Sequence, residues 1–161
     1  MLEQVIEKTN RYIEEMPKKE RKKYGQFFTS IETARYMAEL FVLPEQNAIT
    51  VLDAGAGSGI LTCAMIERLD KIEGINEIIV TCYETDENVL TLLQENLLYM
   101  QECSSKKISI KIITENYITS QYLDFNHMLG GDWNPEKYDI VIGNPPYMKI
   151  SKNAPEVHGN G

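Results

Sequence analysis

The clearest chemical signal is a glycine-rich turn, Asp53-Ala54-Gly55-Ala56-Gly57-Ser58-Gly59. Glycines in such a turn adopt left-handed φ angles easily and let a ligand approach the backbone. The spacing is not that of the dinucleotide fingerprint, because Ile60 stands where the third glycine belongs, and no Gly-Lys-Ser/Thr follows as in a P-loop. A carboxylate at Asp53 repels phosphate and attracts a cation, such as the amino group of a ligand.

Polar residues also follow the next two predicted strands. Glu84 follows residues 78–83, and a carboxylate there accepts two hydrogen bonds from a ribose diol. Asn116 and Tyr117 follow residues 108–113, where an amide can pair with an adenine edge and an aromatic ring can cover its face. Taken singly, Glu84 is explained equally well as a surface acid at a strand end, and Asn116 as an ordinary turn residue. Together they predict a pocket for a nucleoside with a cationic tail and no phosphate, which is S-adenosylmethionine.

The sharpest motif is Asn144-Pro145-Pro146-Tyr147, directly after a fourth apolar stretch. Two prolines stiffen the backbone and remove two amide donors, leaving carbonyls free to accept. The Asn144 side-chain oxygen and the Pro145 carbonyl can both accept from one NH2 group, which favours a pyramidal nitrogen with its lone pair aimed at a methyl group. Tyr147 offers a face on which a planar base or amide can stack. The alternative is a proline-rich turn.

The elements that must position these residues alternate along the chain. Helices are expected at 2–16, from a Thr29-to-Glu32 capping box to Pro44, at 60–69 and from Asp86 to about Met100. Strands are expected at 49–52, 78–83, 108–113 and 138–142. Continuously apolar strands separated by helices indicate a parallel sheet covered on both faces, in a doubly wound α/β fold.

Composition narrows the class of protein. The chain has 161 residues, about one domain, with 16 basic and 24 acidic residues and a net charge of −8, so bulk charge does not favour nucleic acid. A basic cluster, Lys18 to Lys23 interrupted by Glu20, is expected to be a solvated linker face, or alternatively a phosphate contact or a hinge beside the active site. Neither a signal peptide nor an apolar run that could cross a membrane is evident, which predicts a cytoplasmic protein.

The three cysteines predict neither a disulfide framework nor a metal site. They are odd in number, lack metal-ligand spacing, and none follows a proline as a nucleophile for cytosine methylation would. We expect Cys63, Cys82 and Cys103 to be packing residues.

Asp-x-Gly-x-Gly-x-Gly followed by Asn-Pro-Pro-Tyr resembles class I S-adenosylmethionine-dependent methyltransferases that act on amino nitrogens. The stretch Tyr24-Gly25-Gln26-Phe27-Phe28-Thr29-Ser30 further resembles the gamma subgroup of DNA N6-adenine methyltransferases of restriction–modification systems. The resemblance implies a Rossmann-like fold in which this stretch packs on the cofactor. It implies cofactor-binding roles for Gln26, Phe27, Phe28, Thr29, Asp53, Ala54, Gly55, Gly57, Glu84, Thr85, Asp86, Asn116, Tyr117 and Asn144, and catalytic roles for Asn144, Pro145, Pro146 and Tyr147. Asn116 stands where the family commonly has Asp.

The resemblance covers about residues 24–148 and only the front half of such an enzyme. It implies an N-terminal helix and basic linker (1–23), a cofactor-binding catalytic domain (24–150) and a flexible tail (151–161), with the target-recognition domain absent. The expected substrate is a flipped adenine in double-stranded DNA, bound through the absent domain, with a restriction endonuclease as partner or fusion. The alternatives are an N-methyltransferase of protein glutamine or of an RNA base, and a cofactor-binding fragment that is inactive alone.

Overall fold

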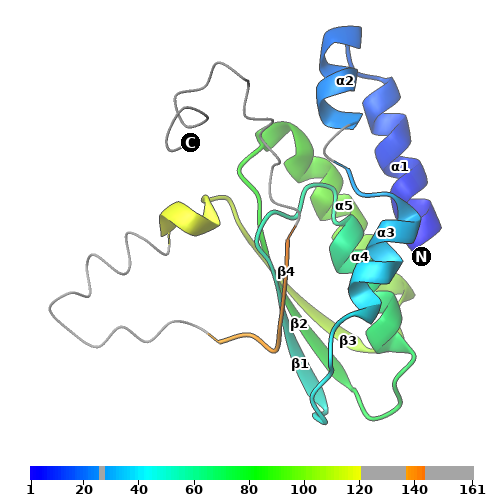
Figure 1. Ribbon diagram of the computed structural model, residues 1–161, viewed down its shortest axis with the longest axis vertical. Coiled ribbons are helices and arrows are strands. Elements are labelled where there is room, and N and C mark those ends of the chain that lie inside the picture. Colours follow the sequence, from blue (N-terminus) through cyan, green and yellow to red (C-terminus); the bar gives the residue numbers. More distant parts are fainter. Residues whose placement is uncertain (26–27, 121–136, 144–161) are drawn as a thin grey trace, which may run out of the picture.

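A four-stranded parallel sheet forms the centre of the computed structural model, which describes residues 1–25, 28–120 and 137–143. The strand order is β3-β2-β1-β4 (Figure 1). The strands are β1 (Ala48–Asp53), β2 (Glu77–Tyr83), β3 (Lys107–Ile113) and β4 (Ile140–Ile142). The helices are α1 (Leu2–Glu14), α2 (Lys18–Gly25), α3 (Ile31–Glu39), α4 (Ile60–Asp70) and α5 (Glu87–Cys103). The expected α/β fold with a parallel sheet and N-terminal helices is confirmed.

The sheet core consists of β-branched side chains in register. Ile49 of β1 pairs with Ile78 of β2, and Val51 pairs with Val80; all four are fully buried. These residues favour a pleated backbone and present one side to the helices. Since every strand runs in the same direction, all the carboxyl ends lie along one edge, which we call the carboxyl edge.

Helices α1, α3, α4 and α5 cover one face of the sheet (Figure 1), while most of the connection from β3 to β4, where cover for the other face was expected, lies outside the described residues. On the other face Ile79 is 37% exposed and Val141 is 52% exposed. The cause is topological: the crossovers β1-α4-β2 and β2-α5-β3 step in the same direction, and right-handed crossovers in one direction place their helices on one face.

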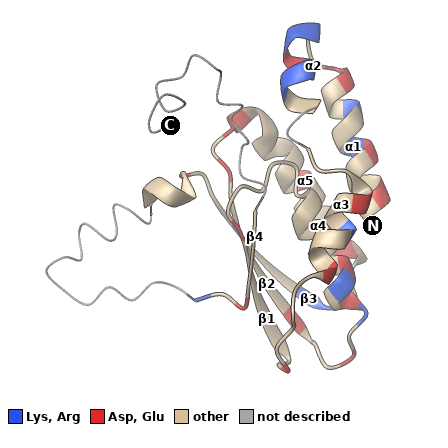
Figure 2. Ribbon diagram, in the orientation of Figure 1, with Lys and Arg blue, Asp and Glu red and all other residues tan. Residues whose placement is uncertain are grey.

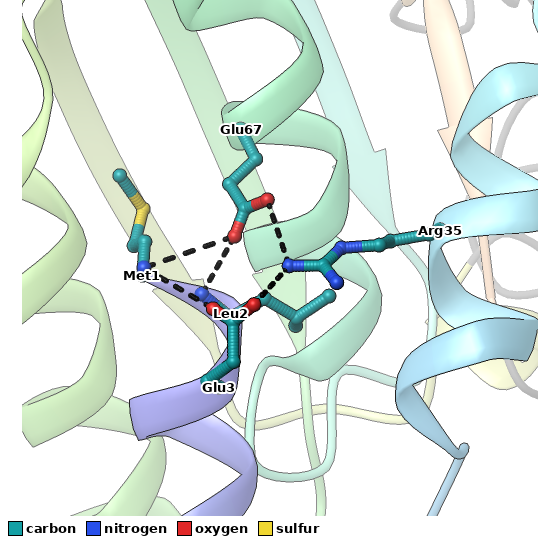
Figure 3. Close-up of polar contacts among 5 residues, drawn as sticks. All are labelled: Met1, Leu2, Glu3, Arg35 and Glu67. Carbon is teal, nitrogen blue, oxygen red and sulfur yellow. Dashed lines mark hydrogen bonds and ion pairs between the residues drawn. The ribbon is translucent and has the colours of Figure 1, made fainter.

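A charged cluster docks the start of α1 between α3 and α4 (Figure 3). The Leu2 backbone N–H donates to Glu67 at 2.7 Å, and the terminal ammonium of Met1 lies 3.8 Å from the same carboxylate. Arg35 reaches Glu67 at 3.5 Å and also pairs with Glu3. The Arg35 guanidinium lowers the pKa of Glu3 to about 2. With Leu2 and Val5 fully buried, α1 is an integral part of the helical layer.

The basic cluster, expected to be a linker, forms the helix α2 instead. The carbonyl of Pro17 accepts from the backbone N–H groups of Glu20 and Arg21, at 2.9 and 3.1 Å, and so starts the helix. Lysine, arginine and glutamate are good helix formers, and none of the α2 residues is buried. The linker expectation rested on the run of charged residues, and a helix without an apolar face leaves no hydrophobic period in the sequence that would reveal it.

Helix α3 begins one residue later than expected. Ser30, not Thr29, is the N-cap, and its hydroxyl accepts from the Thr33 backbone N–H at 3.3 Å. The helix also ends at Glu39, before the apolar residues that had extended it toward Pro44. Two adjacent hydroxyl residues offer alternative caps, and the sequence pattern alone does not choose between them.

Two of the three cysteines are packing residues. Cys63 and Cys82 are fully buried, and burial raises the pKa of Cys63 to about 12 and that of Cys82 as well. The expectation for Cys103 was wrong, because it is exposed at the last turn of α5.

Among the described helices none is long and apolar enough to cross a bilayer.

Gly59 is the glycine of the turn that is most tightly constrained. Its φ is +93°, and a Cβ there would lie 3.2 Å from both Leu93 Cδ1 and Met100 Cε. We expect Gly59→Ala to lower the free energy of unfolding by about 1–3 kcal/mol, from backbone strain and crowding together. Urea denaturation measures this, with Gly74→Ala as the matched control, since nothing lies within 4 Å of a Cβ at Gly74. Equal stability of the two variants would contradict the prediction.

Candidate functional site

The turn after β1 lies at the middle of the carboxyl edge, and backbone hydrogen bonds join it to its neighbours. The Ala54 N–H donates to the Ile142 carbonyl at 3.0 Å, and the Ala56 N–H donates to the Tyr83 carbonyl at 2.9 Å. The Glu84 N–H donates to the Ile113 carbonyl at 3.0 Å. These bonds continue the sheet ladder into the turns, so the predicted site residues after β1, β2 and β3 share one edge.

Asp53 is fully buried at the end of β1. Its Oδ2 accepts from the Thr62 hydroxyl at 2.7 Å, and its Oδ1 accepts from the Gly55 N–H at 3.3 Å. Burial raises the pKa of Asp53 to about 6, while these two hydrogen bonds act in the opposite direction. Asp53 therefore orients the turn and adds a buried negative charge beneath it, for which the described residues supply no cation.

Glu84 bridges the turn after β1 and the turn after β2. Its Oε1 accepts from the Gly57 N–H at 2.7 Å, and its Oε2 accepts from the Asp86 N–H at 3.0 Å. The left-handed φ of Gly57, +57°, directs that N–H toward the carboxylate. Each carboxylate oxygen keeps a second lone pair, and the side chain is half-buried, so Glu84 can still accept from a hydroxyl.

Phe28, in the stretch before α3, lies over the glycine turn. The nearest atom to a Cβ at Gly57 would be Phe28 Cε1, at 3.5 Å. Thr29 follows directly and is half-buried. An aromatic ring from the N-terminal region therefore contacts Gly57, whose N–H is bound by Glu84 from the end of β2.

Asp86 forms hydrogen bonds with α5 on one side of the site and with α2 on the other. Its Oδ1 caps α5 by accepting from the Asn88 N–H at 3.0 Å, and its Oδ2 accepts from the Tyr24 hydroxyl at 2.6 Å. The bond to Asp86 raises the pKa of Tyr24, which keeps the phenol protonated as a donor. Thr85, between the two acids, is exposed. Tyr24 therefore ties α2 to the β2 end of the site.

Asn116 and Tyr117 lie at the β3 end but partly face their own chain. Asn116 is exposed, and its Oδ1 accepts from the Thr119 N–H at 3.0 Å, as in a helix cap. Tyr117 packs edge-on against Tyr83, with ring centroids 5.0 Å apart. The predicted pairing of Asn116 with an adenine edge stays a prediction.

The proline motif and two residues of the N-terminal stretch lie outside the described residues: Gln26, Phe27, Asn144, Pro145, Pro146 and Tyr147. The structure does describe the strand that leads into the motif. Asp139 accepts from the Thr50 N–H at 2.9 Å and from its hydroxyl at 3.0 Å, which pins the start of β4 to β1. At the other end, Gly143 lies beside Ala54. The chain therefore enters the motif next to the glycine turn.

Sequence reasoning missed several supporting residues. Thr62 was overlooked, although a hydroxyl three positions into α4 lies within reach of the acid that ends the preceding strand. The sequence pattern assigns no role to Tyr24, whose hydroxyl donates to Asp86. Buried Ser58 is held by Thr9, whose hydroxyl lies 2.9 Å from the Ser58 hydroxyl, and by Asn96, which donates to the Ser58 carbonyl at 2.8 Å. Long-range pairs such as these leave no periodic signal in the sequence.

The donor set matches the proposed cofactor. Glu84 offers carboxylate oxygens, the fully buried Asp53 adds its negative charge beneath the turn, and no described basic side chain contacts either of them. Carboxylates suit an ammonium group and a ribose diol, and they disfavour phosphates. In the described part of the chain, no three histidine, cysteine or acidic residues gather as metal ligands.

The sequence is similar to several known proteins. The model of the N-6 DNA methylase family matches residues 9–158. Type II methyltransferase M.BsuBI of Bacillus subtilis is 34% identical over 139 residues, which are 84% of this chain and 27% of that protein. A tRNA1(Val) (adenine(37)-N6)-methyltransferase of Proteus mirabilis is 29% identical over 106 residues, which are 66% of this chain and 34% of that protein.

A solved structure shares the fold. It is titled "modification subunit of a putative type I restriction enzyme", from Vibrio vulnificus YJ016, and it superposes with a TM-score of 0.52 at 23% identity. The match covers 75% of this chain and 24% of that one. This chain thus spans about a quarter of the length of M.BsuBI and of the Vibrio subunit.

Proposed function

This chain belongs to the N-6 DNA methylase family, and we propose that it is the cofactor-binding and catalytic part of a DNA adenine methyltransferase. The proposed reaction transfers a methyl group from S-adenosylmethionine to the exocyclic N6 amine of an adenine in duplex DNA, within a restriction–modification system. The observation that carries the proposal is the Glu84 bridge at the carboxyl edge, together with the Asn-Pro-Pro-Tyr sequence that follows β4 along the chain.

The roles of the cofactor-site residues follow from their chemistry. Glu84 accepts from the ribose diol, and the backbone of the glycine turn, from Asp53 to Gly57, lies along the methionine portion. The charge of Asp53 attracts the ligand's cationic groups. Phe28 closes the site from the side of the N-terminal stretch, with Thr29 next to it. When bound, S-adenosylmethionine supplies a methyl group activated by a sulfonium.

The proline motif acts on the substrate nitrogen. An adenine amine is a poor nucleophile because its lone pair is delocalised into the ring. In the proposed arrangement the Asn144 oxygen and the Pro145 carbonyl accept the two amine protons, which favours a pyramidal nitrogen. Tyr147 stacks on the base after it leaves the duplex, because the amine cannot be reached inside the stack. This mechanism needs no covalent enzyme intermediate.

A second candidate is methylation of an RNA base, which the similarity to the Proteus mirabilis tRNA enzyme favours. The two are separated by offering S-adenosylmethionine with a labelled methyl group together with duplex DNA, tRNA or a protein mixture. We expect the label in DNA alone. Label in tRNA or in protein glutamine would contradict the DNA assignment. The same assay, run on this chain by itself, tests whether the chain is active alone.

A further inference from the structure

We propose that helix α2 is a DNA-binding element that contacts backbone phosphates next to the target base. The proposal rests on the proposed function, and it adds a second contact surface, on the chain itself, to whatever a target-recognition region supplies. The surface consists of five cationic side chains on one short helix: Lys18, Lys19, Arg21, Lys22 and Lys23.

The charge on α2 stands apart from the rest of the protein. The chain has a net charge of −8, yet five of the six residues from Lys18 to Lys23 are basic. All five are exposed, and Figure 2 shows the basic residues, in blue, concentrated on α2. Within residues 1–25, 28–120 and 137–143, none of the five forms an ion pair with an acidic side chain. The positive charge of α2 is therefore not neutralised by ion pairs with acidic side chains in this part of the chain.

The stability of helix α2 does not account for its run of basic residues. Lys18 and Lys22 are four residues apart, as are Lys19 and Lys23, so like charges face each other along the helix and weaken it. No residue of α2 is buried, so the helix gains little from packing. A polyanion bound along α2 would relieve this repulsion, whereas water and salt only screen it.

Helix α2 is held in place beside the site. The Tyr24 hydroxyl donates to Asp86 at 2.6 Å, and the Asp86 N–H donates to Glu84 at 3.0 Å. At the other end, Arg21 Nε donates to the Met16 carbonyl at 2.7 Å and fixes the turn from α1. Two residues connect α2 to Phe28, which lies over Gly57. The basic helix is thus anchored to the carboxyl edge, where the target base must enter.

The side chains indicate phosphate contact rather than base reading. Lysine is a compact point charge on a flexible stem, which suits phosphate oxygens and carries no sequence information. Removing such contacts should weaken binding equally for all DNA sequences and should reduce the salt dependence of binding.

The test uses the triple variant Lys18→Gln, Lys19→Gln and Lys22→Gln in the full polypeptide. Arg21 and Lys23 are kept, because Arg21 holds the Met16 carbonyl and Lys23 lies over the Tyr24 ring. The matched control changes three exposed lysines at the opposite edge of the sheet, Lys71, Lys107 and Lys137, to Gln. Both variants change the net charge by the same amount. Circular dichroism and calorimetric binding of S-adenosylmethionine check that the fold and the cofactor site are intact.

DNA affinity is measured by fluorescence anisotropy over a salt series, with two unrelated duplexes. We expect the α2 triple variant to bind both duplexes about tenfold or more weakly and to lower the slope of log K against log salt by about 2 to 3, with the control near wild type. Equal behaviour of the two triple variants, while the wild type methylates DNA, would overturn this inference alone. A wild type that neither binds nor methylates DNA would overturn the proposed function with it.

Discussion

Replacement of Asn144 by alanine is expected to slow methyl transfer about 100-fold while leaving the affinity for S-adenosylmethionine unchanged. In the proposed mechanism the Asn144 oxygen accepts from the amine as the nitrogen becomes pyramidal. It therefore stabilises the transition state more than the bound substrate. Loss of one preorganised polar group of this kind costs about 3 kcal/mol. The chain enters the motif from β4, which is pinned to β1 through Asp139 and Thr50, so the loss is expected to remain local.

Single-turnover methylation of duplex DNA by the full polypeptide measures the rate, and calorimetry measures cofactor affinity. Asn153→Ala is the matched control, because it makes the same chemical change outside the motif. A variant at position 144 that keeps wild-type turnover would show that this side chain does not act on the amine. Weakened cofactor binding with unchanged chemistry would assign Asn144 to the cofactor instead.

The substitution Asp53→Asn is expected to weaken binding of S-adenosylmethionine by about tenfold or more without destabilising the ligand-free protein. An amide of the same shape can still pair with Thr62 and Gly55, so the turn keeps its support. The substitution removes a buried charge, whose desolvation opposes folding, and it removes the attraction to the ligand's cationic groups.

The pH dependence follows from the same burial. The pKa of Asp53 is about 6 in the folded protein, above its ordinary value of 3.8, so the folded state binds the proton more tightly than the unfolded state does. Stability is therefore lost as pH rises from about 4 through 6, and it is level above that range. Cofactor affinity has the opposite trend, rising with pH through about 6 as the carboxylate ionises.

Calorimetric titrations at several pH values between 5 and 8 test this pair of trends, and thermal unfolding over the same range accompanies them. In Asp53→Asn both the affinity and the Asp53 contribution to stability should become flat across pH 6. An affinity that is equal in the two proteins, or a pH profile that survives the substitution, would show that the cofactor does not sense the charge at Asp53.

The parts of the fold that the sequence predicts well are those fixed by local pattern. The strands at Ile49, Ile78 and Ile108 are rich in β-branched residues, and Asp86 was correctly expected to begin a helix. The turn from Asp53 to Gly59 is identified by its glycines. These features depend on neighbours in the chain, so spacing alone reveals them and places the ends of three strands at one edge.

Features that depend on distant contacts were not predictable in this way. Helix α2 has no apolar face to produce a period, and its position depends on a bond from Tyr24 to Asp86, 62 residues away. The exposure of Cys103 depends on which side of α5 meets the sheet, which the sequence leaves open at a helix end. The hydrogen bond from Thr62 to Asp53 depends on the backbone geometry of the whole turn between them. In each case tertiary structure decides between local alternatives of similar free energy.

The most direct test of the account is a calorimetric titration of this chain with S-adenosylmethionine, compared with titration by ATP under the same conditions. The account predicts one site per chain for S-adenosylmethionine, competition by S-adenosylhomocysteine, and no measurable binding of ATP, because the Asp53 charge attracts the amine, Glu84 accepts from the ribose, and both carboxylates repel phosphates. Binding of ATP at this site, or failure of a folded chain to bind S-adenosylmethionine, would contradict it.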